Sequence, residues 1–430
     1  TIIKWLDERL VNRGITDESE KIKFILASYN AGLGHVLDAR RLAEKDGKNP
    51  DVWEDNVDEY ILKKASIKFT EDTGYNFKAM GELEYYLISE KSDLYPSDDQ
   101  KGYHEASPFT NWENLRTEAL LIIAQCGGKI KYGHSEVGNF STDTHMYEQN
   151  EIEFIPVDPE EAVEQLIISK WILRMLGKKH NVVISFAPKI TVGKAGSGLH
   201  IHMMLEKDNK NYVADEVGLT NIAKKLIAGV LERSQSLTAF GNTIPTSYLR
   251  LVPHQEAPTM VCWGDSNRSV LVRVPLGWIA KTNMIKDANP QERGSVPYIP
   301  GKQTVELRSP DGSADLYHLM AGIILAAKDG ILAEDALEKA NKMYVNFNIF
   351  DDKHKEIFNT LKRLPTSCYE SAECLEKDRK FYQKDGVFPE GTIDGFVNRL
   401  KAFDDKNMNE RLFNNHVEIK KLVDNYIHHM

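Results

Sequence analysis

AGSGLHIHMML, residues 195–205, begins with a turn of small residues and continues as an alternating strand. Because successive side chains of a strand point to opposite faces, the apolar side chains share one face, and His200 and His202 share the other. The two imidazoles are then roughly 7 Å apart. This spacing suits one histidine on a metal ion and the next on a neighbouring group such as a phosphate. A surface strand with two solvated histidines explains this stretch alone equally well.

Acidic side chains on further strand-like segments favour the metal interpretation. The segments are GELEYYLI, HSEVGNF, YEQNEIEF and TVELRSPDG, and they alternate carboxylates with apolar or aromatic residues. One acidic pair is often only a solvated strand face, but here the pattern recurs. Together with the histidine strand it selects six ligand-type residues: Glu82, Glu84, Glu136, Glu151, His200 and Glu306.

The composition of this set predicts hard divalent ions. Five of the six residues are carboxylates, which suit Mg²⁺ or Mn²⁺ better than zinc. Six groups are enough for two ions with three ligands each, which leaves positions for substrate oxygens. Four arginines, which bind phosphate or carboxylate with a two-pronged fork, lie in the same part of the sequence: Arg250, Arg268, Arg273 and Arg308. Two metals and several arginines indicate phosphoryl transfer.

Composition sets broad limits on the class of protein. The chain has 430 residues, room for two or three domains, with 41% hydrophobic and 27% charged residues. The net charge of −10 argues against nucleic acid as a main partner. No apolar run approaches the roughly 20 residues of a membrane span, and the first residues show no signal-peptide pattern. Four cysteines without metal-ligand spacing are expected to be free thiols, so we predict a cytoplasmic protein.

Hydrophobic periodicity predicts an α+β fold, a curved and largely antiparallel sheet flanked by helices. We expect helices over 111–127, 159–177, 217–240 and 314–332, and a helical, charged segment after about 333. The second of these helices is expected to bury Trp171 and Met175 on its apolar face. We also expect an inserted loop over Asn139–Tyr147 and a strand over Tyr248–Pro253.

Residues 1–62 read as a separate, short all-α segment. Asp17 and Glu20 form a capping-box-like pattern at the start of one helix, and a second helix is expected from about His35 to Glu44. ASYNAGLGHV resembles a signature of lytic transglycosylases, enzymes that cleave peptidoglycan. That resemblance implies the C-terminal part of such a domain, without its catalytic glutamate. A helical hairpin that matches the signature by chance is the alternative.

Residues 63–430 resemble glutamine synthetase. The motifs GELEYY, EQNEIEF, AGSGLHIH, RLVPHQEAP, NRSVLVRVP and VELRSPDGSADLY follow the order of that family's signatures. The resemblance implies a nucleotide-binding ligase of glutamine biosynthesis and nitrogen metabolism. It would join ammonium to glutamate with ATP, through γ-glutamyl phosphate, using two Mg²⁺ or Mn²⁺ ions.

The resemblance also assigns roles to single residues. Glu84, Glu136 and Glu151 correspond to the ligands of one metal, and Glu82, His200 and Glu306 to those of the metal near the ATP phosphates. Glu256 corresponds to the residue that closes over glutamate and helps to take a proton from ammonium. Arg268 is implied in catalysis as well as in ATP binding. The remaining positions are Gly196, Arg250 and Arg308 for glutamate, and His202, Arg268 and Arg273 for ATP.

Several departures from the family pattern keep alternatives open. The family begins with a β-grasp domain that completes the neighbouring subunit's site in a homo-oligomeric ring, and residues 1–62 show no such motif. Ala195 replaces a usual Asn near glutamate, which leaves room for an amine other than ammonia. The alternatives are therefore a γ-glutamyl ligase that uses another amine, and a truncated or fused chain that binds nucleotide and metal without turnover.

Overall fold

A computed structural model describes residues 2–31, 33–45, 47–52, 60–92, 94–95, 98–253, 257–276, 289–291 and 303–429. Within these residues, nine strands form one sheet in the order β2-β3-β1-β5-β9-β8-β7, with β4 paired to β1 and β6 to β5. Every described strand pair is antiparallel except β7 with β8. The strands are β1 (Asn76–Glu90), β2 (Ile130–Ser141), β3 (His145–Phe154), β4 (Val183–Ser185), β5 (Leu199–Lys207), β6 (Lys210–Asn211), β7 (Trp263–Asp265), β8 (Val272–Val274) and β9 (Val305–Leu307).

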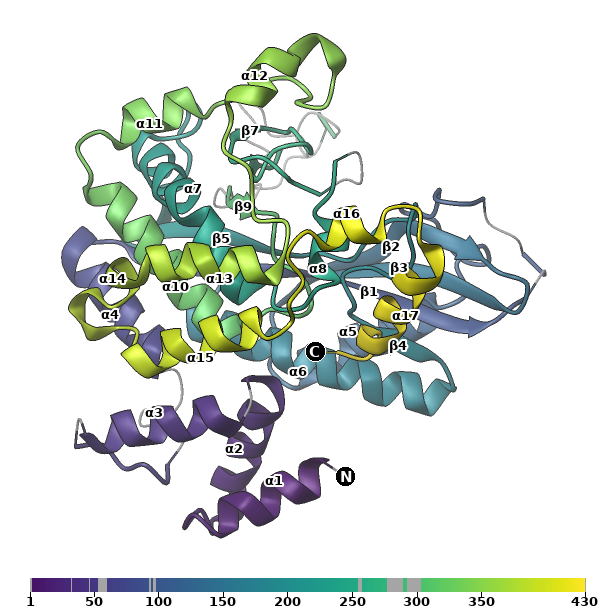
Figure 1. Cartoon of the computed structure of the whole chain (residues 1–430), viewed down its shortest axis with the longest axis horizontal. Helices are drawn as coiled ribbons and strands as arrows, with labels where there is room; N and C mark the ends of the chain where they lie inside the picture. Colours follow the sequence, from purple (N-terminus) through teal and green to yellow (C-terminus); the bar gives the residue numbers. More distant parts are fainter. Residues whose placement is uncertain are drawn as a thin grey trace.

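Helices flank this sheet, which confirms the predicted α+β class (Figure 1). After the N-terminal segment the chain forms α4 (Tyr60–Thr73), α5 (Glu113–Gln125), α6 (Pro159–His180), α7 (Asn221–Gly241), α8 (Ser247–Arg250) and α10 (Leu316–Leu332). Farther along the described chain lie α11 (Ala336–Lys342), α12 (Lys355–Thr360), α13 (Cys368–Lys377), α14 (Arg379–Tyr382), α15 (Glu390–Lys401), α16 (Met408–Leu412) and α17 (His416–Tyr426).

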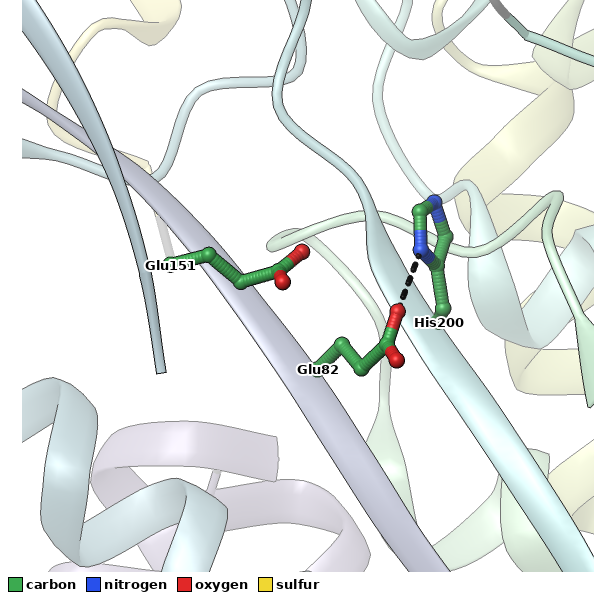
Figure 2. A group of neighbouring side chains, drawn as sticks. All are labelled: Glu82, Glu151 and His200. Carbon is green, nitrogen blue, oxygen red and sulfur yellow. Dashed lines mark hydrogen bonds and ion pairs between the residues drawn. The ribbon is translucent and has the colours of Figure 1, made fainter. Parts of the chain in front are cut away.

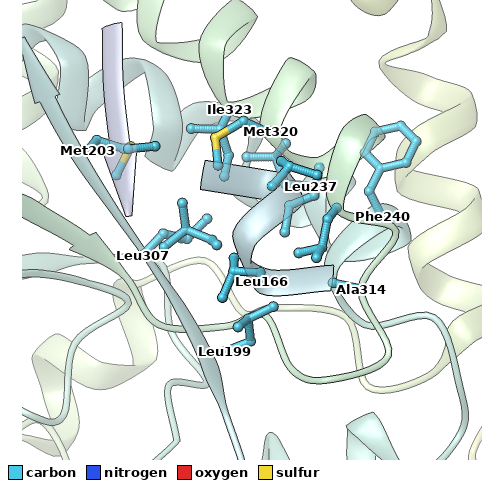
Figure 3. Close-up of a cluster of buried hydrophobic side chains, with 14 of the residues drawn as sticks. Leu166, Leu199, Met203, Leu237, Phe240, Leu307, Ala314, Met320 and Ile323 are labelled. Atoms are coloured by element: carbon cyan, nitrogen blue, oxygen red, sulfur yellow. The ribbon is translucent and has the colours of Figure 1, made fainter. Parts of the chain in front are cut away.

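The main hydrophobic core lies between one face of the sheet and helices α6, α7 and α10 (Figure 3). The apolar side chains of β5, which include Leu199 and Met203, are fully buried in it, as the alternation predicts. Leu166 of α6 packs against the same face, because a Cβ on Gly81 of β1 would lie 2.7 Å from its methyl carbons. The histidines of β5 therefore point to the opposite face, which the core helices do not cover.

Three sequence-based expectations about residues 63–430 are wrong. Asn139–Tyr147 is not an inserted loop, because Asn139 pairs with Glu148 and Phe140 with Tyr147 in the β2–β3 hairpin. Tyr248–Pro253 is not a strand: its start lies in helix α8, where buried Tyr248 donates a hydrogen bond to the carbonyl of Asn242. Tertiary packing overrides strand propensity there. Trp171 and Met175 are 42% and 49% exposed, so the buried face of α6 is narrower than predicted.

The N-terminal segment has a small core of its own. Helices α1 (Ile2–Val11), α2 (Glu18–Ala31) and α3 (Leu33–Lys45) share a cluster that includes Leu10, Phe24 and Val36. Asp17 directly precedes α2, and its Oδ1 accepts hydrogen bonds from the backbone N–H groups of Ser19 and Glu20, as expected of a residue that caps a helix. In Figure 1 these helices lie at one end of the molecule, and the described part of the main core begins only at Leu62.

Among the described residues no single helix has the length and apolar composition of a membrane span. The bent pair α10 and α11 passes that test only when both helices are counted together. Helix α10 is buried in the main core, where its apolar residues pack against the sheet and α7.

A buried lysine under the sheet should make stability depend on pH. Lys170 of α6 is fully buried, and its Nζ donates to the carbonyl of Gly312 at 2.8 Å. Burial lowers the pKa of Lys170 to about 7. Between about pH 7 and the ordinary lysine pKa the native state therefore binds fewer protons than the unfolded state, so stability rises with pH.

We expect this lysine to give a measurable difference between wild type and Lys170→Met. The free energy of unfolding of the wild type, relative to the variant, should rise between pH 7.5 and 9.5 by up to about 1.4 kcal/mol per pH unit. Urea unfolding followed by tryptophan fluorescence measures this difference. Lys178→Met, on the exposed side of the same helix, is the control. A difference that stays flat with pH contradicts the prediction.

Candidate active site

The face of the sheet opposite the core carries a continuous array of ionisable side chains. Strand register brings them together, because residues that pair across neighbouring strands point to the same face. Three rows of paired residues cross the sheet: Tyr132–Glu153–Glu82–His200, His134–Glu151–Glu84, and His202–Glu306–Arg273. Residues from six strands thus meet on one surface.

Glu82 lies at the centre of this array. One carboxylate oxygen, Oε2, is 3.1 Å from His200 Nδ1, and the other, Oε1, is 2.8 Å from His202 Nε2. The two histidines that are too far apart to share one ion easily are therefore joined through one carboxylate. Burial alone would raise the pKa of Glu82, but the two histidines hold it well below its ordinary value. Glu82 is thus ionised at neutral pH.

Glu151 is on the neighbouring strand and faces the same space (Figure 2). Its Oε1 lies 3.1 Å from His134 Nε2. Burial, with repulsion from Glu82 and other nearby carboxylates, raises the pKa of Glu151 well above its ordinary value. Burial also lowers the pKa of His134, which favours the neutral ring. Crowded carboxylates of this kind either take up a proton or bind a cation.

Glu306 is fully buried and is surrounded by positive groups. Arg273 Nη1 donates to its Oε2 and Arg308 Nε to its Oε1, both at 3.0 Å, and His200 Nδ1 is 3.3 Å from Oε1. Burial and the charge of Glu82 raise the pKa of Glu306, whereas the positive charges of Arg308 and His200 lower it. The lowering effects are larger, so the pKa of Glu306 is below its ordinary value.

Glu84 and Glu136 lie beside this centre and are held by backbone N–H groups. Glu84 Oε2 accepts from the N–H of Gly198 at 2.7 Å and from Gln149 Nε2 at 3.0 Å. Half-buried Glu136 accepts from the N–H of Val137 at 3.0 Å. A register shift between Ser135 and Asn139 displaces this part of β2 from a regular pairing with β3.

Three groups of donor atoms in the described residues are close enough to hold a cation, with all atoms of a group within 4.8 Å of one another. They are Glu82–Glu151–His200, Glu82–His202–Glu306 and His134–Glu151–Glu153. This grouping differs from the one that the family resemblance implies. The resemblance groups Glu151 with Glu84 and Glu136, whereas here Glu151 is grouped with Glu82 and His200. Carboxylate and imidazole donors fit Mg²⁺ or Mn²⁺, and the repulsion at Glu151 is a further sign that a cation suits this array.

The Gly-Ser-Gly turn before β5 is packed against Arg250. A Cβ on Gly196 would lie 2.4 Å from the carbonyl oxygen of Pro188, and one on Gly198 would lie 2.5 Å from Arg250 Nη2. Buried Arg250 donates to the carbonyls of Arg308, Ser309 and Pro310. Only glycine fits at these two positions.

Gly198→Ala should therefore weaken metal binding without changing any ligand. Its Cβ would also lie 2.7 Å from His200 Nε2, so the imidazole or Arg250 must move. Because disturbing the support of a metal ligand typically costs 10–100-fold in affinity, we expect Mn²⁺ to bind at least about tenfold more weakly. Isothermal titration with Mn²⁺ measures this. Gly391→Ala, which meets nothing within 4 Å, is the control, and equal affinities in the two variants would refute the prediction.

Two other predicted site residues, Arg268 and Glu256, are not among the described buried groups of this array. Arg268 is exposed, and its guanidinium stacks 5.3 Å from the ring centroid of Tyr103. Glu256 lies outside the described residues. Sequence reasoning did not assign Gln149, His134 or Glu153 to the site. The alternation Gln149–Glu151–Glu153 along β3 was the available signal.

Comparisons with known proteins agree on one family. Residues 59–419 match the family model described as glutamine synthetase, catalytic domain. The chain is 29% identical to the glutamine synthetase of Clostridium saccharobutylicum and 31% identical to that of Pyrococcus furiosus, each over 326 residues and 74% of this chain. It spans about two thirds of the length of these relatives, 66% and 65%.

Solved structures show the same fold. A cryo-EM structure of Plasmodium falciparum glutamine synthetase superposes with a TM-score of 0.62 at 21% identity, covering 83% of this chain and 78% of that one. A complex of GmaS with ADP superposes with a TM-score of 0.64 at 20% identity, covering 84% and 79%.

Proposed function

The chain belongs to the glutamine synthetase family, and from this premise we propose that it is an ATP-dependent ligase that forms glutamine from glutamate and ammonium. The observation that carries the proposal is the array of buried carboxylates and histidines on one sheet face, with Arg273 and Arg308 beside it. In the proposed reaction an oxygen of the glutamate γ-carboxylate attacks the γ-phosphorus of ATP, and ADP leaves. Ammonia then attacks the acyl carbonyl carbon of γ-glutamyl phosphate, the C–N bond forms, and inorganic phosphate leaves.

We propose that two divalent ions, Mg²⁺ or Mn²⁺, are held by the predicted ligands. The candidate donors are Glu82, Glu84, Glu136, Glu151, His200 and Glu306. Bound divalent ions would supply neutralisation of phosphate charge in this chemistry. The residues themselves pre-arrange the site, because Gly198 and Gln149 fix Glu84, and two arginines fix Glu306.

The substrate roles of the remaining residues are proposals from the same resemblance. Glutamate would be bound by Gly196, Arg250 and Arg308, and the ATP phosphates by His202, Arg268 and Arg273. The position of Arg250 supports a positioning role, since its donors hold the segment that follows Arg308. Glu256 is proposed as the group that takes a proton from ammonium, so that neutral ammonia can attack.

A labelling experiment tests the two-step reaction. Glutamate with ¹⁸O in its γ-carboxylate is incubated with the full chain, ATP, Mg²⁺ and ammonium. If γ-glutamyl phosphate forms, the attacking carboxylate oxygen leaves with the phosphorus, and the released phosphate carries one ¹⁸O. Phosphate without the label would show that water attacks ATP directly, and the proposed reaction would be wrong.

The identity of the amine is tested by comparing candidate amine substrates one at a time. Ammonium is the proposed acceptor, and a γ-glutamyl ligase for another amine is the second candidate, which Ala195 beside the glutamate-binding turn favours. Phosphate release is measured with ammonium, methylamine and ethylamine in turn. A higher kcat/KM for an alkylamine would select the second candidate. ATP binding without release under any of these conditions would indicate a nucleotide-binding chain without turnover.

Further features of the chain are proposed on resemblance alone. We place the domain division between residues 62 and 63, with a helical segment over 1–62 and a catalytic domain over 63–430. The resemblance of residues 1–62 to a lytic transglycosylase stays a prediction, because none of the comparisons above bears on it. A cytoplasmic location and assembly into a homo-oligomer are likewise proposals, as the family relationship suggests.

A further inference from the structure

We propose a third divalent-cation site, formed by His134, Glu151 and Glu153 on strands β2 and β3. The three donor groups of the sheet face form a chain in which each neighbouring pair shares one carboxylate. In the order given above, Glu82 belongs to the first and second groups, and Glu151 belongs to the first and third. The proposal rests on the proposed ligase site, because it extends that site by one ion beyond the two that the reaction is expected to use.

His134 is oriented as a metal-ligating histidine would be. Its Nδ1 is 3.0 Å from the carbonyl oxygen of Ser135. Because a carbonyl oxygen can only accept, the hydrogen of the neutral ring is on Nδ1, and Nε2 carries the free lone pair. That lone pair faces Glu151 Oε1 at 3.1 Å. In metal-binding histidines, one ring nitrogen usually donates a hydrogen bond to a backbone carbonyl, and the electron pair of the other nitrogen binds the metal.

The surroundings keep the His134 ring in place. Its ring stacks on that of His104, with centroids 4.3 Å apart, and on that of Tyr132 at 5.4 Å. The imidazole is buried, and the two stacked rings restrict its orientation. A lone pair fixed in this way beside a carboxylate oxygen requires a proton or a cation between the two atoms.

Glu153 completes the group, and its carboxylate is paired with the ammonium group of Lys131. Its carboxylate accepts hydrogen bonds from Lys131 Nζ and from the hydroxyl of Tyr132. Glu153 is buried, whereas the side chain of Lys131 is 46% exposed. The ammonium group can therefore swing into solvent when a divalent ion takes its place. Lys131 then competes with the ion for Glu153, and its removal should raise the affinity of the third site for the ion.

The test is the number of Mn²⁺ ions bound by the full chain, measured with Mn²⁺ alone by isothermal titration and by the EPR signal of free Mn²⁺. The wild type should bind three ions per chain. Two variants, His134→Phe, which keeps the ring stacking, and Glu153→Gln, should each bind two. Lys131→Met should bind three, with the third ion at least threefold tighter. His145→Phe, at the exposed start of β3, is the matched control.

The outcomes separate this inference from the proposed function. Two ions in the wild type and in both variants would overturn the third site and leave the two-metal ligase standing. Three ions that persist in both His134→Phe and Glu153→Gln would also overturn it. A wild type that binds no Mn²⁺ would contradict the proposed function itself. Circular dichroism spectra of the variants establish that each one is folded before its ions are counted.

Discussion

Glu82→Gln is expected to lower the affinity for Mn²⁺ at least about 100-fold and to lower phosphate release from ATP by about 100- to 1,000-fold. Glu82 is the only residue shared by the groups Glu82–Glu151–His200 and Glu82–His202–Glu306 in the described part of the chain. The amide has nearly the same shape but lacks the charge, so the loss reports on cation binding. Titration with Mn²⁺ and a phosphate-release assay measure the two effects.

The control for this prediction lies on the same strand. Glu90 is at the exposed end of β1, so Glu90→Gln removes one charge from β1 without touching the site. It should keep wild-type affinity and rate. If Glu82→Gln binds Mn²⁺ as tightly as Glu90→Gln does, Glu82 does not hold a cation and the assignment of the array fails.

Arg250→Ala is expected to destabilise the protein by about 3 kcal/mol or more and to raise the KM for glutamate in the fraction that stays folded. The buried guanidinium donates to three backbone carbonyls, those of Arg308, Ser309 and Pro310. Each buried acceptor left without its donor costs about 1–3 kcal/mol. The same truncation removes the packing of Gly196 and Gly198. Urea unfolding and steady-state kinetics measure the two effects.

Arg174→Ala is the matched control for Arg250→Ala. Arg174 also donates to backbone carbonyls, those of His428 and His429, but these contacts are at the surface. Its loss should change stability by less than about 1 kcal/mol. Equal effects of the two variants would show that Arg250 does not hold the segment after Arg308. A glutamate KM unchanged in folded Arg250→Ala would separate this residue from glutamate binding.

Alternation along single strands was predictable from the sequence. LHIHMML places His200 and His202 on one face because its apolar residues must be buried. On the other face, Leu199, Ile201, Met203 and Leu205 are all in the core. GELEYY does the same for Glu82 and Glu84. These local patterns follow from the period of two in a strand and need no knowledge of the fold.

The grouping of the ligands was not predictable from local patterns. It depends on which strands are neighbours and in what register, and β1, β5 and β9 are far apart in the chain. The register Glu82↔Glu153 and His202↔Glu306 decides that Glu153 and His202 join the array. A one-residue slip in either pairing would turn the site-facing side chains of a strand toward the core and its apolar side chains toward the site.

Packing also overrode local preference in helix α8. YLRLV has the composition of a strand, but the Tyr248 hydroxyl hydrogen-bonds that of Ser371 and Arg250 donates to the carbonyl of Ser309, both far away in the sequence. The short helix presents both side chains to the interior. Similarly, nothing local in the sequence distinguishes exposed Trp171 from the buried residues of α6. Long-range contacts of this kind decide the remaining details of the site.

The most direct test of the central claim is phosphate release from ATP by the full chain with Mg²⁺, measured without glutamate, with glutamate, and with glutamate plus ammonium. A glutamine-forming ligase predicts release that requires glutamate and rises when ammonium is added. Release that is independent of glutamate, or no release while ATP is bound, would contradict the claim that this array of carboxylates, histidines and arginines is a ligase site.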